Sequence, residues 1–131
     1  MLKIASPLPG ELEDLIEKVL GSCGAVHREL GPGLLEGLYS RAARIELEAR
    51  GIRFEAEKPI PVRYRDRVLC SHRLDLFIEN RVVLEIKSVD ALHPIHVAQV
   101  LSYLRITGAR VGLLINFNVP VLKQGIRRVI L

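Results

Sequence analysis

Residues 73–87 read RLDLFIENRVVLEIK and decide the fold, because they contain two apolar strands joined by a short polar turn. If residues 79–81 form a three-residue loop, the strands pair in antiparallel register with all their aliphatic side chains matched, whereas a two-residue loop would set Asp75 against Leu84. The predicted opposite pairs are Asp75 and Glu85, Leu74 and Ile86, Leu76 and Leu84, and Ile78 and Val82. One face of the hairpin is then aliphatic, and the other carries Arg73, Asp75, Glu85 and Lys87.

The charged face predicts a metal site. Directly opposed side chains stand about 4.5–5.5 Å apart at Cβ, and two carboxylates that close repel each other unless a cation lies between them. A hard divalent ion such as Mg²⁺ suits carboxylate oxygens, and Lys87 adds a positive donor beside Asp75 and Glu85. The alternative is the ordinary polar face of a half-exposed strand. Residues 82–86 are too apolar for that reading, since such a run is typical of a strand covered on both sides.

The composition predicts a single globular domain over residues 1–131, with 49% hydrophobic and 26% charged residues. No apolar run approaches the roughly 18 residues of a membrane span, so we expect no membrane association. The N-terminus soon turns acidic and does not resemble a signal peptide. Cys23 and Cys70 lack a CxxC partner, and we expect them to stay reduced, in a cytoplasmic protein.

A net charge of +4 is compatible with a polyanionic partner. The basic residues form two modest clusters, one of Arg63, Arg65 and Arg67 and the other of Lys123, Arg127 and Arg128. Either cluster could contact phosphates weakly, or could simply be a solvated face. The sequence does not distinguish these readings.

Hydrophobic spacing predicts an α/β domain in which helices flank a mixed sheet, in the order ααββββαββ. The helices are expected over residues 9–30, 34–50 and 95–107, with Gly51 and Gly108 ending the last two. The strands are expected over 52–57, 60–64, 68–78, 82–89, 111–115 and 126–131. Pro59 and Pro61 place the second strand at an edge or a bend.

Several polar residues on the predicted helices could join the charged face. Glu36 and Tyr39 lie three residues apart on one helix face, and Gln99 and Tyr103 lie four apart on another. Each has a plainer alternative: Glu36 as a solvated acid favoured by the helix dipole, and Gln99 as a surface or cap residue. The pairs Cys23–His27 and His93–His96 have zinc-ligand spacing, but neither has obvious third and fourth ligands.

Residues 33–39 spell G-x-x-E-x-x-Y, and with this motif the chain resembles the GxxExxY family, which is grouped with the PD-(D/E)XK nuclease superfamily. The resemblance runs from His27 to Arg128. It implies a restriction-endonuclease-like core, in which Asp75 and Glu85 bind the metal and Lys87 is the catalytic lysine. It further implies that Glu36 is the helical acid and that Gln99 is the glutamine of exonuclease-like branches. Leu74 replaces the proline of the signature, at a position that carries no chemistry.

The resemblance and the charged face together predict a nuclease dependent on Mg²⁺ or Mn²⁺ that hydrolyses phosphodiester bonds in nucleic acid, with DNA favoured over RNA. Tyr39, Tyr103 and His27 are expected as accessory residues of the site. A homodimer or a protein partner would supply any targeting. The alternatives are a non-catalytic module that binds nucleic acid or protein, and a hydrolase acting on another phosphate.

Overall fold

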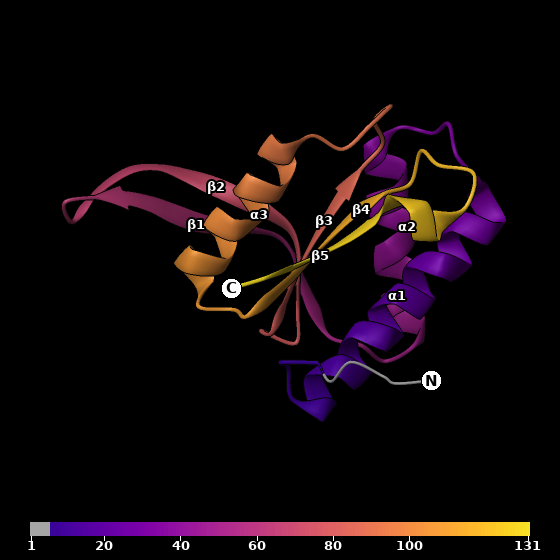
Figure 1. Ribbon diagram of the computed structural model, residues 1–131, viewed down its shortest axis with the longest axis horizontal. Helices are drawn as coiled ribbons and strands as arrows, with labels where there is room; N and C mark the ends of the chain where they lie inside the picture. The colour runs from indigo at the N-terminus through magenta and orange to yellow at the C-terminus, as the bar shows by residue number, and fades with distance from the viewer. Residues whose placement is uncertain (1–5) are drawn as a thin grey trace.

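The computed structural model describes residues 6–131 and has the predicted mixed α/β architecture (Figure 1). Its elements are α1 (Gly10–Leu30), α2 (Glu36–Ala49), β1 (Phe54–Tyr64), β2 (Arg67–Ile78), β3 (Val82–Lys87), α3 (Pro94–Thr107), β4 (Val111–Asn116), a 3₁₀ turn η1 (Leu122–Gly125) and β5 (Ile126–Ile130).

The five strands form one sheet in the order β1-β2-β3-β4-β5. Only β3 and β4 run parallel, and α3 makes the crossover between them. Figure 1 shows α1 and α2 on one side of the sheet and α3 on the other. The fold is therefore three layers, and the central strand β3 is buried on both faces, as its apolar sequence predicts.

Two hydrophobic clusters occupy the two faces of the sheet. The larger joins α1 and α2 to alternate residues of the central strands, including Val82, Leu84 and Ile86. The smaller joins α3 to the intervening residues, including Val83 and Leu114. Because side chains alternate along a strand, Glu85 and Lys87 share the face of Val83.

The predicted turn and register of the β2–β3 hairpin are confirmed where the two strands pair. Leu76 lies opposite Leu84 and Ile78 opposite Val82. Glu79 and Asn80, in the loop, both adopt positive φ, which asparagine tolerates better than most residues.

The prediction was wrong about the strand before it. The two short strands expected over 52–57 and 60–64 are one continuous strand, β1, so three strands separate α2 from α3. Both prolines fit within it because β1 is an edge strand, which needs hydrogen-bond donors on one side only. Glu57 has φ 51°, and the strand changes faces there: Ala56 packs on the α1–α2 side, whereas Ile60 belongs to the cluster under α3.

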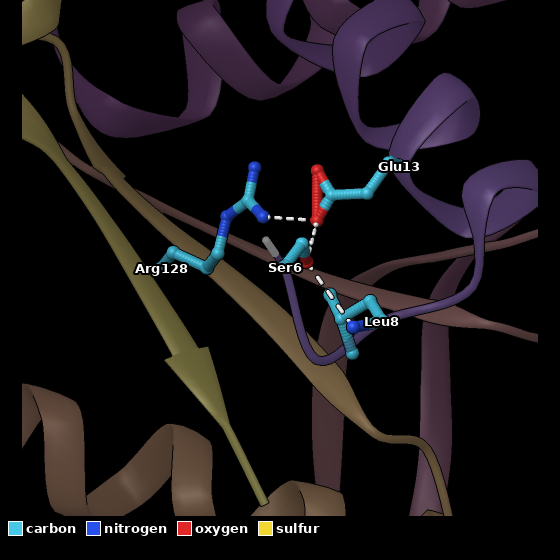
Figure 2. Close-up of polar contacts among 4 residues, drawn as sticks. All are labelled: Ser6, Leu8, Glu13 and Arg128. Carbon is cyan, nitrogen blue, oxygen red and sulfur yellow. Dashed lines mark hydrogen bonds and ion pairs between the residues drawn. The ribbon is translucent and has the colours of Figure 1, made fainter. Parts of the chain in front are cut away.

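A polar contact ties the start of the described chain to the last strand (Figure 2). Ser6 Oγ donates to Glu13 Oε1 at 2.7 Å, and Arg128 on β5 donates to the same carboxylate. These two donors lower the pKa of the Glu13 carboxyl. The contact therefore joins α1 to β5 across the sequence.

Both cysteines are free. Burial raises the pKa of the Cys23 thiol to about 12, so Cys23 behaves as a core residue. None of the helices in the described part of the chain is both long and apolar enough to cross a membrane.

Candidate metal and phosphate site

The β2–β3 ladder ends where the two predicted carboxylates meet. Beyond the pair of Leu76 and Leu84 the strands separate. Hydrogen bonds from backbone amides to side chains replace the backbone–backbone hydrogen bonds there. Asp75 N donates to Glu85 Oε1 at 3.1 Å, and Ile86 N donates to Asp75 Oδ2 at 2.8 Å. The structure thus brings Asp75 and Glu85 together, with one oxygen of each anchored to the opposite strand.

One part of the predicted face pattern was wrong. Leu74 does not share the aliphatic face of Leu76, but is fully buried in the cluster under α3 with Phe77. Like β1 at Glu57, β2 changes faces at Asp75. The two irregularities lie side by side, since the pairs Ala56–Leu76 and Lys58–Leu74 flank them. Asp75 therefore lines the groove under α2, whereas Glu85 stays on the α3 side with Val83. The prediction that both acids lie on one face was wrong in this respect, and they meet between the two strands instead.

The site holds its acids in an environment that disfavours charge. Burial, and after it the negative charge of Asp75, raise the pKa of Glu85 to about 8. Burial also raises the pKa of Asp75, against the opposing effects of the Ile86 hydrogen bond and the positive charges of Lys87 and Arg44. A strongly perturbed acid pair of this kind is typical of functional sites.

Lys87, Glu36 and His96 gather beside the acid pair. Lys87 is half-buried at the end of β3, and its charge lowers the pKa of both carboxyls. The pKa of His96, in the first turn of α3, is lowered first by burial and then by the charge of Lys87, while Glu36 opposes the shift. Glu36 itself is exposed at the start of α2. The ends of three elements therefore meet at this point.

His93 and His96 cap the start of α3, which explains their spacing without a zinc ion. His93 N donates to His96 Nδ1 at 3.1 Å, and the two residues form a capping box at the start of α3. Within residues 6–131, no group of three or more His, Cys, Asp or Glu side chains is arranged to hold a metal ion. Asp75 and Glu85 would thus be two protein donors in a shell otherwise made of water, backbone carbonyl and substrate oxygens.

A groove of about 440 Å³ opens from Asp75 toward α2, and its lining includes Glu36, Arg41, Arg44 and Glu57. Sequence reasoning missed Arg44. Its Nε is buried without a hydrogen-bond partner among the described residues, although its charge acts on the carboxyl of Asp75. A buried donor left unpaired in a groove is a natural contact for an oxyanion.

Tyr39 holds the loop that precedes Glu36. It is fully buried and stacks on Phe117, with ring centroids 4.7 Å apart. Its hydroxyl donates to Gly31 O and accepts from Leu34 N at 3.1 Å. Ser88 Oγ, one residue beyond Lys87, donates to Leu34 O at 2.6 Å. The loop before α2 is thereby tied to the end of β3, which sets Glu36 beside Lys87.

The other predicted accessory residues differ in where they lie. Tyr103 adjoins the acids: burial, followed by the charges of Glu85 and Asp75, raises its pKa to about 12. Its hydroxyl lies 3.4 Å from His72 Nδ1. Gln99 lines a different depression, with His96 and three neighbours on α3. His27 is buried in the α1 core, where its Nε2 lies 2.8 Å from Val119 O. His27 therefore does not join the acids.

The two basic clusters also differ. Arg128 binds Glu13, and Arg127 donates to the carbonyls of Gln124 and Ile126. Arg63 and Arg67 flank the turn of the β1–β2 hairpin, where every side chain is exposed.

Comparison with known proteins gives one match. A family model described as the PD-(D/E)XK nuclease superfamily matches residues 13–129, which is nearly the whole chain. No curated protein and no solved structure matches.

Proposed function

Because the chain belongs to the PD-(D/E)XK nuclease superfamily, we propose that it is a divalent-metal-dependent nuclease that hydrolyses phosphodiester bonds in nucleic acid, with DNA preferred over RNA. The observation that carries this proposal is the contact between Asp75 and Glu85 where β2 and β3 part, with Lys87 beside them.

The donor set suits Mg²⁺ or Mn²⁺. Asp75 and Glu85 each keep one carboxylate oxygen beyond the one that accepts a backbone N–H. Mg²⁺ usually takes one or two carboxylates and keeps several waters, which agrees with two protein acids and an open groove. When bound, such an ion supplies a water of lowered pKa and charge stabilisation at the scissile phosphate.

The remaining residues act on substrate and water. Lys87 orients the attacking water and offsets negative charge on the phosphate, as a fixed ammonium can. Arg44 binds a non-bridging phosphate oxygen in the groove through its unpartnered Nε. Glu36 holds water on the α2 side of the site. Tyr39 is a positioning residue, because it fixes the loop that carries Glu36.

Within the superfamily we propose that the chain is a GxxExxY protein, which residues 33–39 support. The loop contacts of Tyr39 give that motif a physical reason, since the glycine end and the tyrosine of the motif meet in space. Gln99 remains a candidate for contacting substrate as it enters over α3. A cytoplasmic location and a homodimer or protein partner for targeting complete the proposal.

The test is cleavage by pure protein of labelled single- and double-stranded DNA and RNA with Mg²⁺, Mn²⁺ or EDTA. We expect cleavage of DNA with either metal, none with EDTA, and loss of cleavage in Lys87→Ala with the metal-linked rise in Tm retained. The exposed Lys18→Ala is the matched control and should cut like wild type. If no polynucleotide is cut under any metal condition, the nuclease proposal fails and a binding module takes its place.

A further inference from the structure

The outer half of the β1–β2 hairpin extends beyond the rest of the sheet. Residues 67–74 of β2 pair with β1 alone, because β3 pairs only with residues 76–78. Figure 1 shows the end of this hairpin reaching past α3 as a narrow two-stranded ribbon, whereas its base packs under α3 through Ile60 and Leu74. We call residues 63–73 the arm, and every one of them is exposed.

The arm concentrates the positive charge of the protein. It holds four arginines and one aspartate, a net charge of +3, in a chain whose net charge is +4. Within residues 6–131, its arginines form none of the ion pairs that engage Arg50, Arg53 and Arg128. Uncompensated charge on a thin exposed element is the electrostatic footprint of a polyanion partner.

The tip of the arm has an unfavourable backbone. Arg65 and Asp66 form the two-residue turn, with φ of 48° and 63°. Such turns favour Asn, Asp or Gly, so Asp66 suits its position, whereas the left-handed conformation costs about 1–2 kcal/mol for a residue such as Arg65. An arginine held there, with its guanidinium 5.9 Å from the Tyr64 ring, is displayed at the end of the ribbon at the expense of stability.

We propose that the arm enters the major groove of double-stranded B-form DNA, with Arg63, Arg65 and Arg67 on the flanking phosphates. A major groove about 12 Å wide admits a two-stranded β-ribbon, whereas the major groove of A-form RNA is too deep and narrow for side chains to read. This inference rests on the proposed function, because it names the duplex on which the Asp75–Glu85 site acts.

The arm is short enough for one DNA duplex to contact both the arm and the Asp75–Glu85 site. Arg67 and Asp75 are eight residues apart on one strand, which is about 26 Å at ~3.3 Å per residue. That length is below one turn of B-DNA, about 34–36 Å. The arm can therefore lie in the groove while the acids at its base face a phosphate less than one turn away.

A competing occupant is a second copy of the chain. Val68 and Leu69 are 55% and 65% exposed on the free edge of β2, and an open edge can pair with another strand. The charge of the arm favours DNA, because two copies paired along this edge would bring their arginines together.

The experiment measures binding to a labelled DNA duplex, an RNA duplex and single-stranded DNA by anisotropy, in EDTA, between 50 and about 200 mM salt. The arm variant is Arg63→Gln/Arg65→Gln/Arg67→Gln. The matched control, Lys18→Gln/Arg28→Gln/Arg110→Gln, removes the same charge from exposed residues outside both basic clusters. We expect wild type to prefer the DNA duplex. The arm variant should lose at least tenfold in affinity at about 100 mM salt. The slope of log affinity against log salt concentration should become shallower by about 3, because each lost phosphate contact accounts for ~0.9.

The inference is overturned if the control loses as much affinity as the arm variant, or if RNA duplex or single strands bind as tightly as DNA duplex. It is also overturned if sedimentation shows a dimer that Val68→Ser/Leu69→Ser dissociates while DNA binding is unchanged. Cleavage with Mg²⁺ is scored separately. If the duplex binds through the arm but is not cut, the proposed nuclease is refuted and this inference stands. If DNA is cut but the arm variant keeps the wild-type salt slope, the proposed nuclease stands and this inference is refuted.

Discussion

The stability of the metal-free protein should fall as pH rises from 5 to 8, and Glu85→Gln should remove most of that fall. Burial and the charge of Asp75 raise the pKa of Glu85 from 4.5 in the unfolded chain to about 8 in the folded one. Between these values the folded state holds a proton that the unfolded state has released. Raising the pH therefore favours unfolding across this window.

The size of the effect follows from the two pKa values. At 1.36 kcal/mol per pKa unit, full titration of Glu85 alone gives about 3.5 kcal/mol between pH 5 and pH 8. Because Asp75 shares the charge, we expect roughly 2–4 kcal/mol. For 131 residues, an unfolding entropy of about 2.1 cal/mol/K per residue converts this to a fall in Tm of roughly 7–14 °C.

The assay is thermal unfolding in EDTA at several pH values, followed by circular dichroism. The glutamine side chain of the Glu85→Gln variant would keep an oxygen to accept the Asp75 N–H and would not titrate. The exposed Glu17→Gln serves as the control and should keep the wild-type slope. If Glu85→Gln and wild type lose stability equally between pH 5 and pH 8, the acid pair does not have the electrostatics described above.

Three further predictions concern the site. Asp75→Asn should abolish the gain in unfolding free energy that Mg²⁺ gives wild type, about 2.7 kcal/mol at 100-fold over Kd; an equal gain in both proteins would reject Asp75 as a ligand. Tyr39→Phe should lower the urea-derived free energy of unfolding by about 1–3 kcal/mol, because the Gly31 carbonyl and the Leu34 N–H lose their partner, and an unchanged midpoint would contradict that role. Arg44→Gln should reduce kcat/KM for DNA cleavage at least tenfold with the Mg²⁺-linked Tm shift retained, whereas loss of both would make Arg44 structural.

The sequence predicts most of the helices, strands and strand register, because these depend on the local spacing of hydrophobic residues. Alternating side chains specify the register of Leu76 and Leu84, since a slip by one residue would turn every aliphatic side chain outward. What escaped prediction depends on contacts between distant segments. The shared change of face at Glu57 and Asp75 arises from two strands bending together, and neither strand signals it alone.

The candidate site divides in the same way. Asp75 and Glu85 could be paired from sequence because a single hairpin carries both. Arg44 and His96 enter the site only through the packing of α2 and α3 around it. His27 has suitable chemistry, but it packs against the segment that follows β4, beside Phe117 and the Val119 carbonyl. Its spacing from Cys23 carried no information about that location.

The two backbone amides that donate to the Asp75 and Glu85 carboxylates can also report on the charge of the site. Asp75 N–H and Ile86 N–H each end on a carboxylate oxygen, so any change of charge there must alter the polarisation of both protons. In a ¹H–¹⁵N spectrum, these two resonances should move together when an ion or a phosphate enters and when Glu85 titrates. Candidate substrates can thus be screened by spectroscopy before any reaction is known, with the resonances of the distant Leu131 and Gly51 amides as internal references.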